Sequence, residues 1–149
     1  MAAVSHTLGL IKPDAVEAGL MGRILSDIEA AGFRIAAMKM LRLSRAQAEA
    51  FYAVHRERPF FASLVEFMTS GPVVAFVIEG ENAVERYRQL MGATDPAKAE
   101  PNTLRARYAQ NIERNAVHGS DSPTSARREI AFFFSELELV SLNAEVVAV

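Results

Sequence analysis

The apolar residues of this chain alternate between two kinds of spacing, and this alternation restricts the possible folds more than any other feature. The continuous apolar run 73–78 has the length of a strand that is covered on both faces. By contrast, Met21, Ile24, Leu25 and Ile28 have the i, i+3, i+4, i+7 spacing of one apolar helix face. Strand-like and helix-like segments follow one another along the chain, which predicts a two-layer α/β sandwich.

The order of these segments predicts a particular topology. We expect strands over 7–12, 33–43, 73–78 and 115–118, and helices over 21–28, 44–55, 59–68, 82–91 and 122–134. The two consecutive helices after the second strand form a helical hairpin. When the hairpin and the C-terminal helix are set aside, βαββαβ remains, which is the ferredoxin-like arrangement with an antiparallel sheet. Because this arrangement hosts many activities, the fold alone leaves the function open.

Short polar signals indicate where the helices begin. Ser44 with Gln47, and Asn82 with Glu85, have the spacing of a capping box, in which the first side chain accepts a hydrogen bond from the helix backbone. Pro59 suits the first position of a helix, where the backbone N–H has no partner inside the helix. We therefore expect helices to start at these three points.

Arg88 lies on the apolar stripe of its predicted helix, together with Tyr87 and Met91. A half-buried guanidinium requires an anionic partner, and Glu85 is the only acidic residue within helical reach. The next segment, 92–114, is irregular and contains prolines, so we predict a long functional loop with one helical turn near its middle.

Charge is distributed unevenly, although the formal net charge of the 149 residues is only −2. The stretch 86–128 contains eight basic and four acidic residues, net +4, and the remainder contains eight basic and fourteen acidic residues, net −6. Thirteen of the sixteen basic residues are Arg, whose planar side chain matches phosphate and carboxylate groups. We therefore expect an anionic ligand and no specific nucleic-acid partner.

The composition excludes several classes of protein. The chain contains no cysteine, so disulfide scaffolds, zinc–cysteine sites and thiol catalysis are ruled out. No run approaches the roughly 18 apolar residues of a membrane span, and the first residues lack the pattern of a signal peptide. Because both patterns are missing, we expect a cytoplasmic protein with no membrane partner. The absence of cysteine also suits a reducing compartment.

The segment 115–121 has the densest set of chemically active side chains, because His118 at a strand end is followed by a glycine, a hydroxyl and a carboxylate. No glycine-rich phosphate loop occurs in the sequence. A metal site is disfavoured because the other histidines, His6 and His55, are distant in sequence. A Ser/His/Asp triad is poorly supported because Ser120 is only two residues from His118.

Several separated motifs occur together in this chain. They are Ile11-Lys12-Pro13-Asp14, Arg58-Pro59-Phe60-Phe61, Ser70-Gly71-Pro72-Val73-Val74, Met91-Gly92-Ala93-Thr94, Asn115-Ala116-Val117-His118-Gly119-Ser120-Asp121 and Glu129-Ile130. In this order they resemble the motifs of the nucleoside diphosphate kinase family, whose signature is N-x-x-H-G-S-D. The resemblance covers about residues 5–140 and implies a single domain over 1–149 with a C-terminal tail over 141–149.

The resemblance implies an activity and a mechanism. It implies transfer of the γ-phosphate of a nucleoside triphosphate, such as ATP, to a nucleoside diphosphate by a ping-pong route through phosphohistidine. His118 is the implied nucleophile, phosphorylated on its pros nitrogen, with Glu129 and Ser120 orienting the ring. This role fits the chemistry of neutral imidazole, whose in-plane lone pair allows a covalent intermediate that divides one transfer into two.

The resemblance also implies how nucleotides are bound. Around the phosphates and sugar it implies Lys12, Tyr52, Arg88, Thr94, Arg105 and Asn115, with Phe60 and Ile112 against the base. Mg²⁺ is expected mainly on the phosphates, with Asp121 contacting it at most through water. The implied partners are ATP, GTP, ADP, GDP and deoxynucleoside diphosphates, and further copies of the chain in a homotetramer or homohexamer.

Two other functions compete with this interpretation. The first is an inert nucleotide-binding or phosphate-binding module on the same fold. The second is an RNA-binding domain, which requires aromatic side chains on the central strands, whereas the run 73–78 contains only Phe76. The chain also departs from the family at Asn102, where a glycine is common, and in the tail 141–149, which we expect to pack on a neighbouring subunit.

Overall fold

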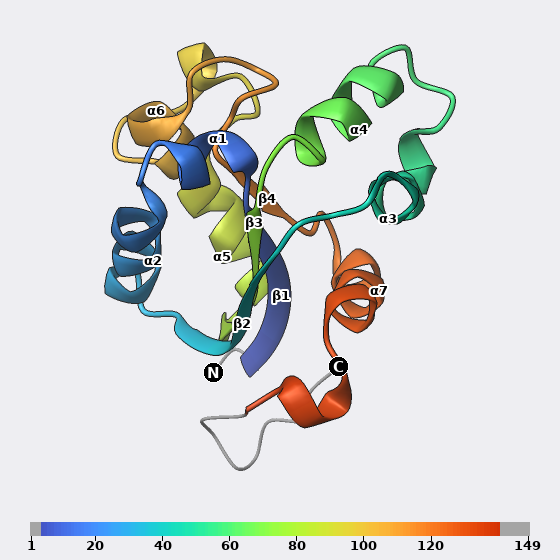
Figure 1. The fold of residues 1–149 in the computed structure, drawn as a ribbon. Coiled ribbons are helices and arrows are strands. Elements are labelled where there is room, and N and C mark those ends of the chain that lie inside the picture. The colour runs from blue at the N-terminus through green and yellow to red at the C-terminus, as the bar shows by residue number, and fades with distance from the viewer. Residues whose placement is uncertain (1–3, 141–149) are drawn as a thin grey trace.

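The computed structural model describes residues 4–140, which form a four-stranded antiparallel sheet with helices on both faces (Figure 1). The strands are β1 (Val4–Ile11), β2 (Arg34–Leu41), β3 (Val73–Glu81) and β4 (Val117–Gly119). Their order in the sheet is β2-β3-β1-β4, and each neighbouring pair is antiparallel. This order confirms the predicted ferredoxin-like arrangement.

The helices cover the sheet in two groups. They are α1 (Pro13–Glu17), α2 (Met21–Ala30), α3 (Arg45–Phe51), α4 (Phe61–Met68), α5 (Ala83–Met91), α6 (Leu104–Tyr108) and α7 (Pro123–Phe133), with 3-10 turns η1 (Ala53–His55), η2 (Pro96–Lys98) and η3 (Glu136–Glu138). Figure 1 shows α2 and α5 on one side of the sheet and α7 on the other, with the hairpin of α3 and α4 beyond one end of the strands.

Strand β3 explains the continuous apolar run, because its residues alternate between two cores. Val73 and Ala75 belong to the core packed with α3, α4 and α7, whereas Val74 and Phe76 belong to the core packed with α2 and α5. Each of these four side chains is at most 1% exposed. A strand in the middle of two layers therefore has no polar face.

Some helix starts match the sequence signals. Ser44 and Gln47 form the predicted capping box, with the Gln47 N–H donating to Ser44 Oγ (3.1 Å) and the Ser44 N–H donating to Gln47 Oε1 (2.9 Å). Ser122 caps α7 by accepting a hydrogen bond from the Ser125 N–H at 3.0 Å, and Pro123 is the first helical residue. These caps use residues that are close in sequence, so the sequence suffices to predict them.

Two other helix starts differ from the prediction. Pro59 is not the first residue of α4, because residues 58–61 form a turn in which the Phe61 N–H donates to the Arg58 carbonyl, and the helix begins at Phe61. Asn82 precedes α5 but makes no side-chain cap, since its backbone is left-handed (φ 47°). Ser5 Oγ instead accepts the Ala83 N–H at 3.0 Å.

The segment 92–114 is the predicted long loop, and it contains η2 and the short helix α6, close to the expected position. Asn102 has φ 71°, a left-handed conformation that asparagine tolerates better than most residues, which accounts for its place where a glycine is common. Helix α1 was not predicted. The tail 141–149 lies outside the described residues. Within residues 4–140 no helix is long and apolar enough to span a bilayer.

Candidate active site

His118 lies in β4, opposite Leu10 of β1, and its ring is held by Glu129 of α7. The distance from His118 Nε2 to Glu129 Oε1 is 2.7 Å, and Ser120 Oγ donates to the same carboxylate oxygen at 3.0 Å. The His118 and Glu129 side chains are 19% and 13% exposed. Three predicted site residues are thus joined in one hydrogen-bonded group.

This hydrogen-bonded group favours one tautomer of the His118 ring. A carboxylate accepts hydrogen bonds, so Glu129 favours the tautomer in which His118 carries its proton on Nε2 and its lone pair on Nδ1. Ser120 is fixed in turn, because it is 1% exposed and its N–H donates to the Leu8 carbonyl at 3.1 Å. The imidazole is therefore held from the Nε2 side, and this tautomer leaves the lone pair on Nδ1.

Two aromatic side chains at the end of α3 pack against this imidazole. The rings of Phe51 and Tyr52 have their centroids 5.4 and 6.2 Å from that of His118, both edge-on. The Tyr52 hydroxyl is buried and has no hydrogen-bond partner within residues 4–140. Burial, and then the charge of Glu129, raises the pKa of Tyr52, so the hydroxyl stays protonated and can donate to a ligand.

Lys12 follows β1 directly and is 7% exposed. Its Nζ donates to Asn115 Oδ1 at 2.8 Å. Burial and then the charge of Arg105 lower its pKa to about 8, against the opposing effects of Asp14 and Glu113. The ammonium group is therefore largely charged at neutral pH, and an arriving anion restores favourable interactions for it.

Asn115 connects Lys12 to the loop 92–114. Its Nδ2 donates to the carbonyls of Thr94 (3.3 Å) and Ile112 (3.1 Å). Thr94 is exposed, and Ile112 is 62% exposed. On the helical hairpin, Phe60 is 47% exposed, with its ring centroid 5.5 Å from that of His55. Two large apolar side chains of the predicted base site are therefore available to a ligand.

Arg105 and Arg88 are placed differently from each other. Arg105 is 8% exposed and donates to the carbonyls of Gly92 (3.0 Å) and Val117 (2.9 Å), so it ties the loop to β4. Arg88 is exposed rather than half-buried, because it lies at the edge of the buried face of α5. The predicted need for a buried anionic partner is therefore wrong. Burial lowers the pKa of Arg105, and the charge of Arg88 lowers it further, against the opposing effect of Tyr87.

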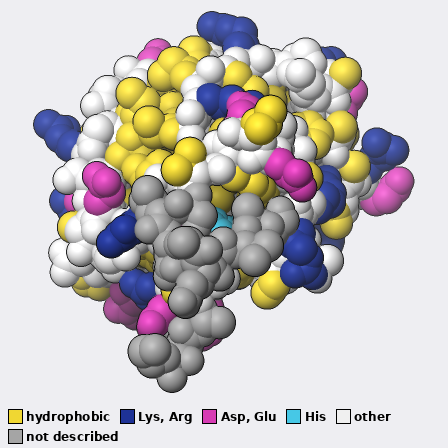
Figure 2. Space-filling view, turned by 90° about the horizontal axis from the view of Figure 1, so that it is seen from below, with side chains coloured by type: hydrophobic (Ala, Val, Ile, Leu, Met, Phe, Trp, Pro, Cys, Tyr) yellow, Lys and Arg dark blue, Asp and Glu magenta, His cyan; other side chains and the backbone are white. Residues whose placement is uncertain are grey.

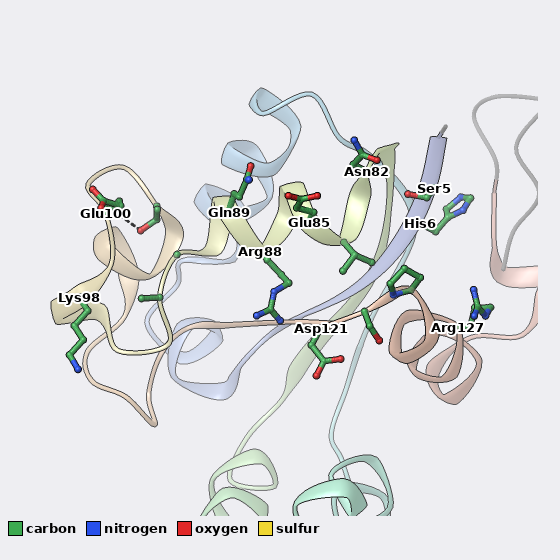
Figure 3. Close-up of a pocket in the computed structure, with 16 residues that line it drawn as sticks. Ser5, His6, Asn82, Glu85, Arg88, Gln89, Lys98, Glu100, Asp121 and Arg127 are labelled. Atoms are coloured by element: carbon green, nitrogen blue, oxygen red, sulfur yellow. Dashed lines mark hydrogen bonds between the residues drawn. The ribbon is translucent and has the colours of Figure 1, made fainter. Parts of the chain in front are cut away.

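A pocket of about 1040 Å³ opens beside Arg88, between α5, the loop that follows it and the start of α7. Figure 3 shows the Arg88 side chain extending from α5 toward Asp121, which also lines the pocket. Of the predicted site residues, only these two line it within the described part of the chain. The group around His118 and the group around Lys12 lie outside this pocket.

Asp121 lines this pocket together with Arg88. A hydrogen bond from Ser125 Oγ (2.5 Å) is the main cause that lowers the Asp121 pKa, and Arg88 adds to the effect. Residues 4–140 contain no group of three metal-ligating side chains. These residues therefore fit a divalent metal ion whose ligands come mainly from a bound phosphate and water, with one carboxylate nearby.

A family model described as nucleoside diphosphate kinase matches residues 5–139 of this chain. The chain belongs to the nucleoside diphosphate kinase family. The match includes the candidate residues around His118 and around Lys12 and the loop 92–114, as the sequence motifs predict. Membership makes the chain a nucleotide-binding kinase, and kinases of this type use a divalent metal ion.

Named relatives support this membership. The nucleoside diphosphate kinase of Desulfovibrio desulfuricans is 61% identical over 136 residues, which are 91% of this chain and 98% of the relative. That of Nitratidesulfovibrio vulgaris (strain DP4) is 58% identical over 137 residues, 92% of this chain and 99% of the relative.

Solved structures of the nucleoside diphosphate kinase family have the same fold. The Aquifex aeolicus enzyme superposes with a TM-score of 0.91 at 52% identity, covering 93% of this chain and all of that one. The Halobacterium salinarum enzyme, solved in complex with CDP, gives a TM-score of 0.91 at 41% identity, covering 96% of this chain and 95% of that one.

The sequence interpretation missed two residues that contact the candidate site. Phe51 was not among the predicted site residues, yet its ring contacts His118, and Arg128 donates to the Phe51 carbonyl at 2.9 Å. Asp14 was noted only as part of a motif, yet it is 4% exposed and accepts the backbone N–H of Ala116 at 3.1 Å. The signal for Asp14 was its place directly after Lys12-Pro13.

Proposed function

We propose that this protein transfers the γ-phosphate of a nucleoside triphosphate to a nucleoside diphosphate through a phosphohistidine at Nδ1 of His118. The observation that carries the proposal is the 2.7 Å hydrogen bond between His118 Nε2 and Glu129 Oε1, supported by Ser120. It leaves the Nδ1 lone pair as the nucleophile. A covalent intermediate lets one site serve both substrates in turn.

The first half-reaction forms a P–N bond. The lone pair of His118 Nδ1 attacks the γ-phosphorus, and the bond to the bridging oxygen breaks, with its electron pair leaving on the β-phosphate of the nucleoside diphosphate. The proton on Nε2 stays in place, so the phosphorylated ring gains positive charge that the Glu129 carboxylate stabilises. In the second half-reaction, a terminal oxygen of another nucleoside diphosphate attacks the phosphorus and the P–N bond breaks.

Cations and donors around His118 supply the binding and charge stabilisation. Lys12, Arg88 and Arg105 are the cations assigned to the phosphates, and the Tyr52 hydroxyl and Thr94 are the additional donors. Because phosphoryl transfer depends mainly on positioning and charge neutralisation, these groups replace a glycine-rich loop. Burial keeps Lys12 and Arg105 in an environment where their charges act strongly.

The sugar and the base are assigned to the other exposed groups. Asn115 and Lys12 are already joined by a hydrogen bond and are available to ribose hydroxyls. Phe60 stacks on the base and Ile112 covers its other face, which both exposures permit. Since every base has a π-face, this mode of binding accepts ATP, GTP, ADP, GDP and deoxynucleotides.

The metal ion of the reaction is proposed to be Mg²⁺, with Asp121 as the residue that contacts its water shell. The ionised Asp121 beside Arg88 suits this role, because Mg²⁺ retains several of its waters when it binds phosphates. When bound, the ion neutralises phosphate charge and supports the transfer.

We also propose that residues 5–140 act as one catalytic unit within a homotetramer or homohexamer in the cytoplasm. Strand β2 is at the edge of the sheet, and its Met38 and Met40 are 51% and 53% exposed. Figure 2 shows that exposed apolar side chains cover a broad area of one face of the molecule. An exposed edge strand with apolar side chains favours association. Light scattering coupled to size exclusion distinguishes the two assemblies.

Phosphate transfer in two separate steps tests the proposed function. Incubation with γ-labelled ATP and Mg²⁺ is expected to label the protein, and later addition of unlabelled GDP is expected to move the label into GTP. His118→Ala should remain unlabelled while still binding ADP. A protein that binds nucleotides but never acquires label would be the inert module, and label that persists in His118→Ala would refute the mechanism.

A further inference from the structure

The backbone turns abnormally just before His118. Ala116 has φ 73°, in the left-handed region that alanine rarely adopts, although its side chain is completely buried. The Val117 N–H donates to the Asn115 carbonyl at 2.8 Å, which closes a γ-turn centred on Ala116. A γ-turn with positive φ is strained, so other contacts must hold it.

Both backbone polar groups of Ala116 are bonded to the segment that follows β1. The Ala116 N–H donates to Asp14 Oδ2 at 3.1 Å, and the Ala116 carbonyl accepts the Lys12 N–H at 2.8 Å. The Asp14 carboxylate is 4% exposed, and its Oδ1 has no hydrogen-bond partner within residues 4–140. Burying a carboxylate with an unpaired oxygen costs free energy of folding. The presence of Asp14 here therefore indicates a role other than stabilising the fold.

We propose that Asp14 is a positioning residue, which holds the Ala116 turn so that Asn115 and His118 are correctly placed and which keeps Lys12 charged for the phosphates. Asn115 is the first residue of this turn, and His118 directly follows its last residue, Val117. Asp14 therefore acts through Ala116 and Lys12, as a buried positioning residue. The inference rests on the proposed function.

The charges around Lys12 support the second part of this role. The charge of Arg105 disfavours the charged form of Lys12, whereas Asp14 and Glu113 favour it. Glu113 is exposed and its charge is screened by solvent, but Asp14 is buried beside Lys12. Burial raises the pKa of Asp14, while Lys12 and the Ala116 N–H lower it. The two buried charges therefore stabilise each other.

Asp14→Asn separates the charge from the hydrogen bond, because the amide oxygen can still accept the Ala116 N–H. In the wild-type protein kcat/KM is expected to fall as pH rises through about 8, where Lys12 loses its proton. In Asp14→Asn this fall is expected about one pH unit lower, since an opposite charge has been removed. The matched control is Glu17→Gln, an exposed carboxylate at the end of the same helix, which should leave the profile unchanged.

Asp14→Ala removes the hydrogen bond as well, and the phosphorylation rate of His118 is expected to fall about tenfold to 100-fold. When Ala116→Gly is added to Asp14→Ala, the phosphorylation rate should rise about tenfold, because glycine adopts positive φ without strain. Asp14→Asn at pH 6.5 should be at least tenfold faster than Asp14→Ala. A residue with only a structural role would change the melting temperature without this rescue or the altered pH profile.

Binding of ADP to the resting protein separates this inference from the proposed function. Calorimetry at pH 7 and pH 9 needs no phosphate transfer, and Asp14→Asn should weaken ADP binding more at pH 9 than Glu17→Gln does. A wild-type protein that binds ADP but is never labelled would contradict the proposed function only. Equal pH profiles for Asp14→Asn and wild type, or an Asp14→Asn protein that is unfolded at pH 7, would overturn the role of Asp14.

Discussion

Replacement of Glu129 by Gln tests the orientation of His118 most sharply. Glu129 Oε1 accepts two hydrogen bonds, from His118 Nε2 at 2.7 Å and from Ser120 Oγ at 3.0 Å. Gln keeps an acceptor oxygen and nearly the same volume but removes the negative charge. Hydrogen bonds to a charged group are about twice as strong as neutral ones, and the charge matters more when the phosphorylated ring becomes cationic.

The expected loss is about 1.4 to 2.7 kcal/mol in the barrier to phosphorylation, which corresponds to about tenfold to 100-fold in rate. Affinity for ADP should change by less than about twofold, because Glu129 contacts the imidazole and Ser120 rather than the phosphate-binding groups.

Quenched-flow measurement of protein phosphorylation by γ-labelled ATP gives the rate, and calorimetry with ADP gives the affinity. The control is Glu66→Gln, which removes an exposed carboxylate from α4 and should leave both values unchanged. Equal losses of rate and affinity in Glu129→Gln would refute a purely orienting role, and an unchanged rate would refute any role in orientation.

Three further predictions follow from the described contacts. The value of kcat/KM should decrease at most tenfold per pH unit above pH 8, because Lys12, with its pKa lowered to about 8, binds phosphates only when protonated; a flat profile to pH 10 would contradict this. Gly119→Ala should lower the free energy of unfolding, measured in urea, by about 1 to 3 kcal/mol, since a Cβ there would lie 2.6 Å from Met91 Cε. The control Gly22→Ala should not be destabilising, because a Cβ at this position in α2 would meet open space. Phe60→Ala should raise KM about fivefold to 100-fold for purine and pyrimidine nucleotides alike, because stacking on its half-exposed ring is insensitive to the base.

The elements of the fold follow from local patterns, and the structure shows why. The capping box at Ser44 and the apolar run in β3 depend on residues near in sequence or on burial between two layers. Asn82 was mistaken for a side-chain cap because the actual acceptor, Ser5, lies 78 positions away from Ala83. Contacts of that range depend on the completed sheet and leave no local signal.

Some residues of the candidate site have a local sequence signal, and others are placed by contacts between distant parts of the chain. His118, Ser120 and Glu129 are recognisable from a compact motif and a residue eleven positions further on, and they lie together in the structure. The contact between Asp14 and Ala116 spans 102 positions and depends on a left-handed backbone that an alanine does not indicate. The family resemblance therefore points to the candidate residues within its motifs better than to the long-range contacts that hold them.

The position of phosphorus on His118 is the measurement that tests the central claim most directly. Protein phosphorylated by ATP and kept alkaline can be examined by ³¹P NMR and by mass spectrometry of its peptides. Since Nε2 is hydrogen-bonded to Glu129, the phosphate is expected on Nδ1 of His118. No phosphate is expected on nearby serines such as Ser122. Phosphate on Nε2, or on a serine instead of His118, would contradict the mechanism.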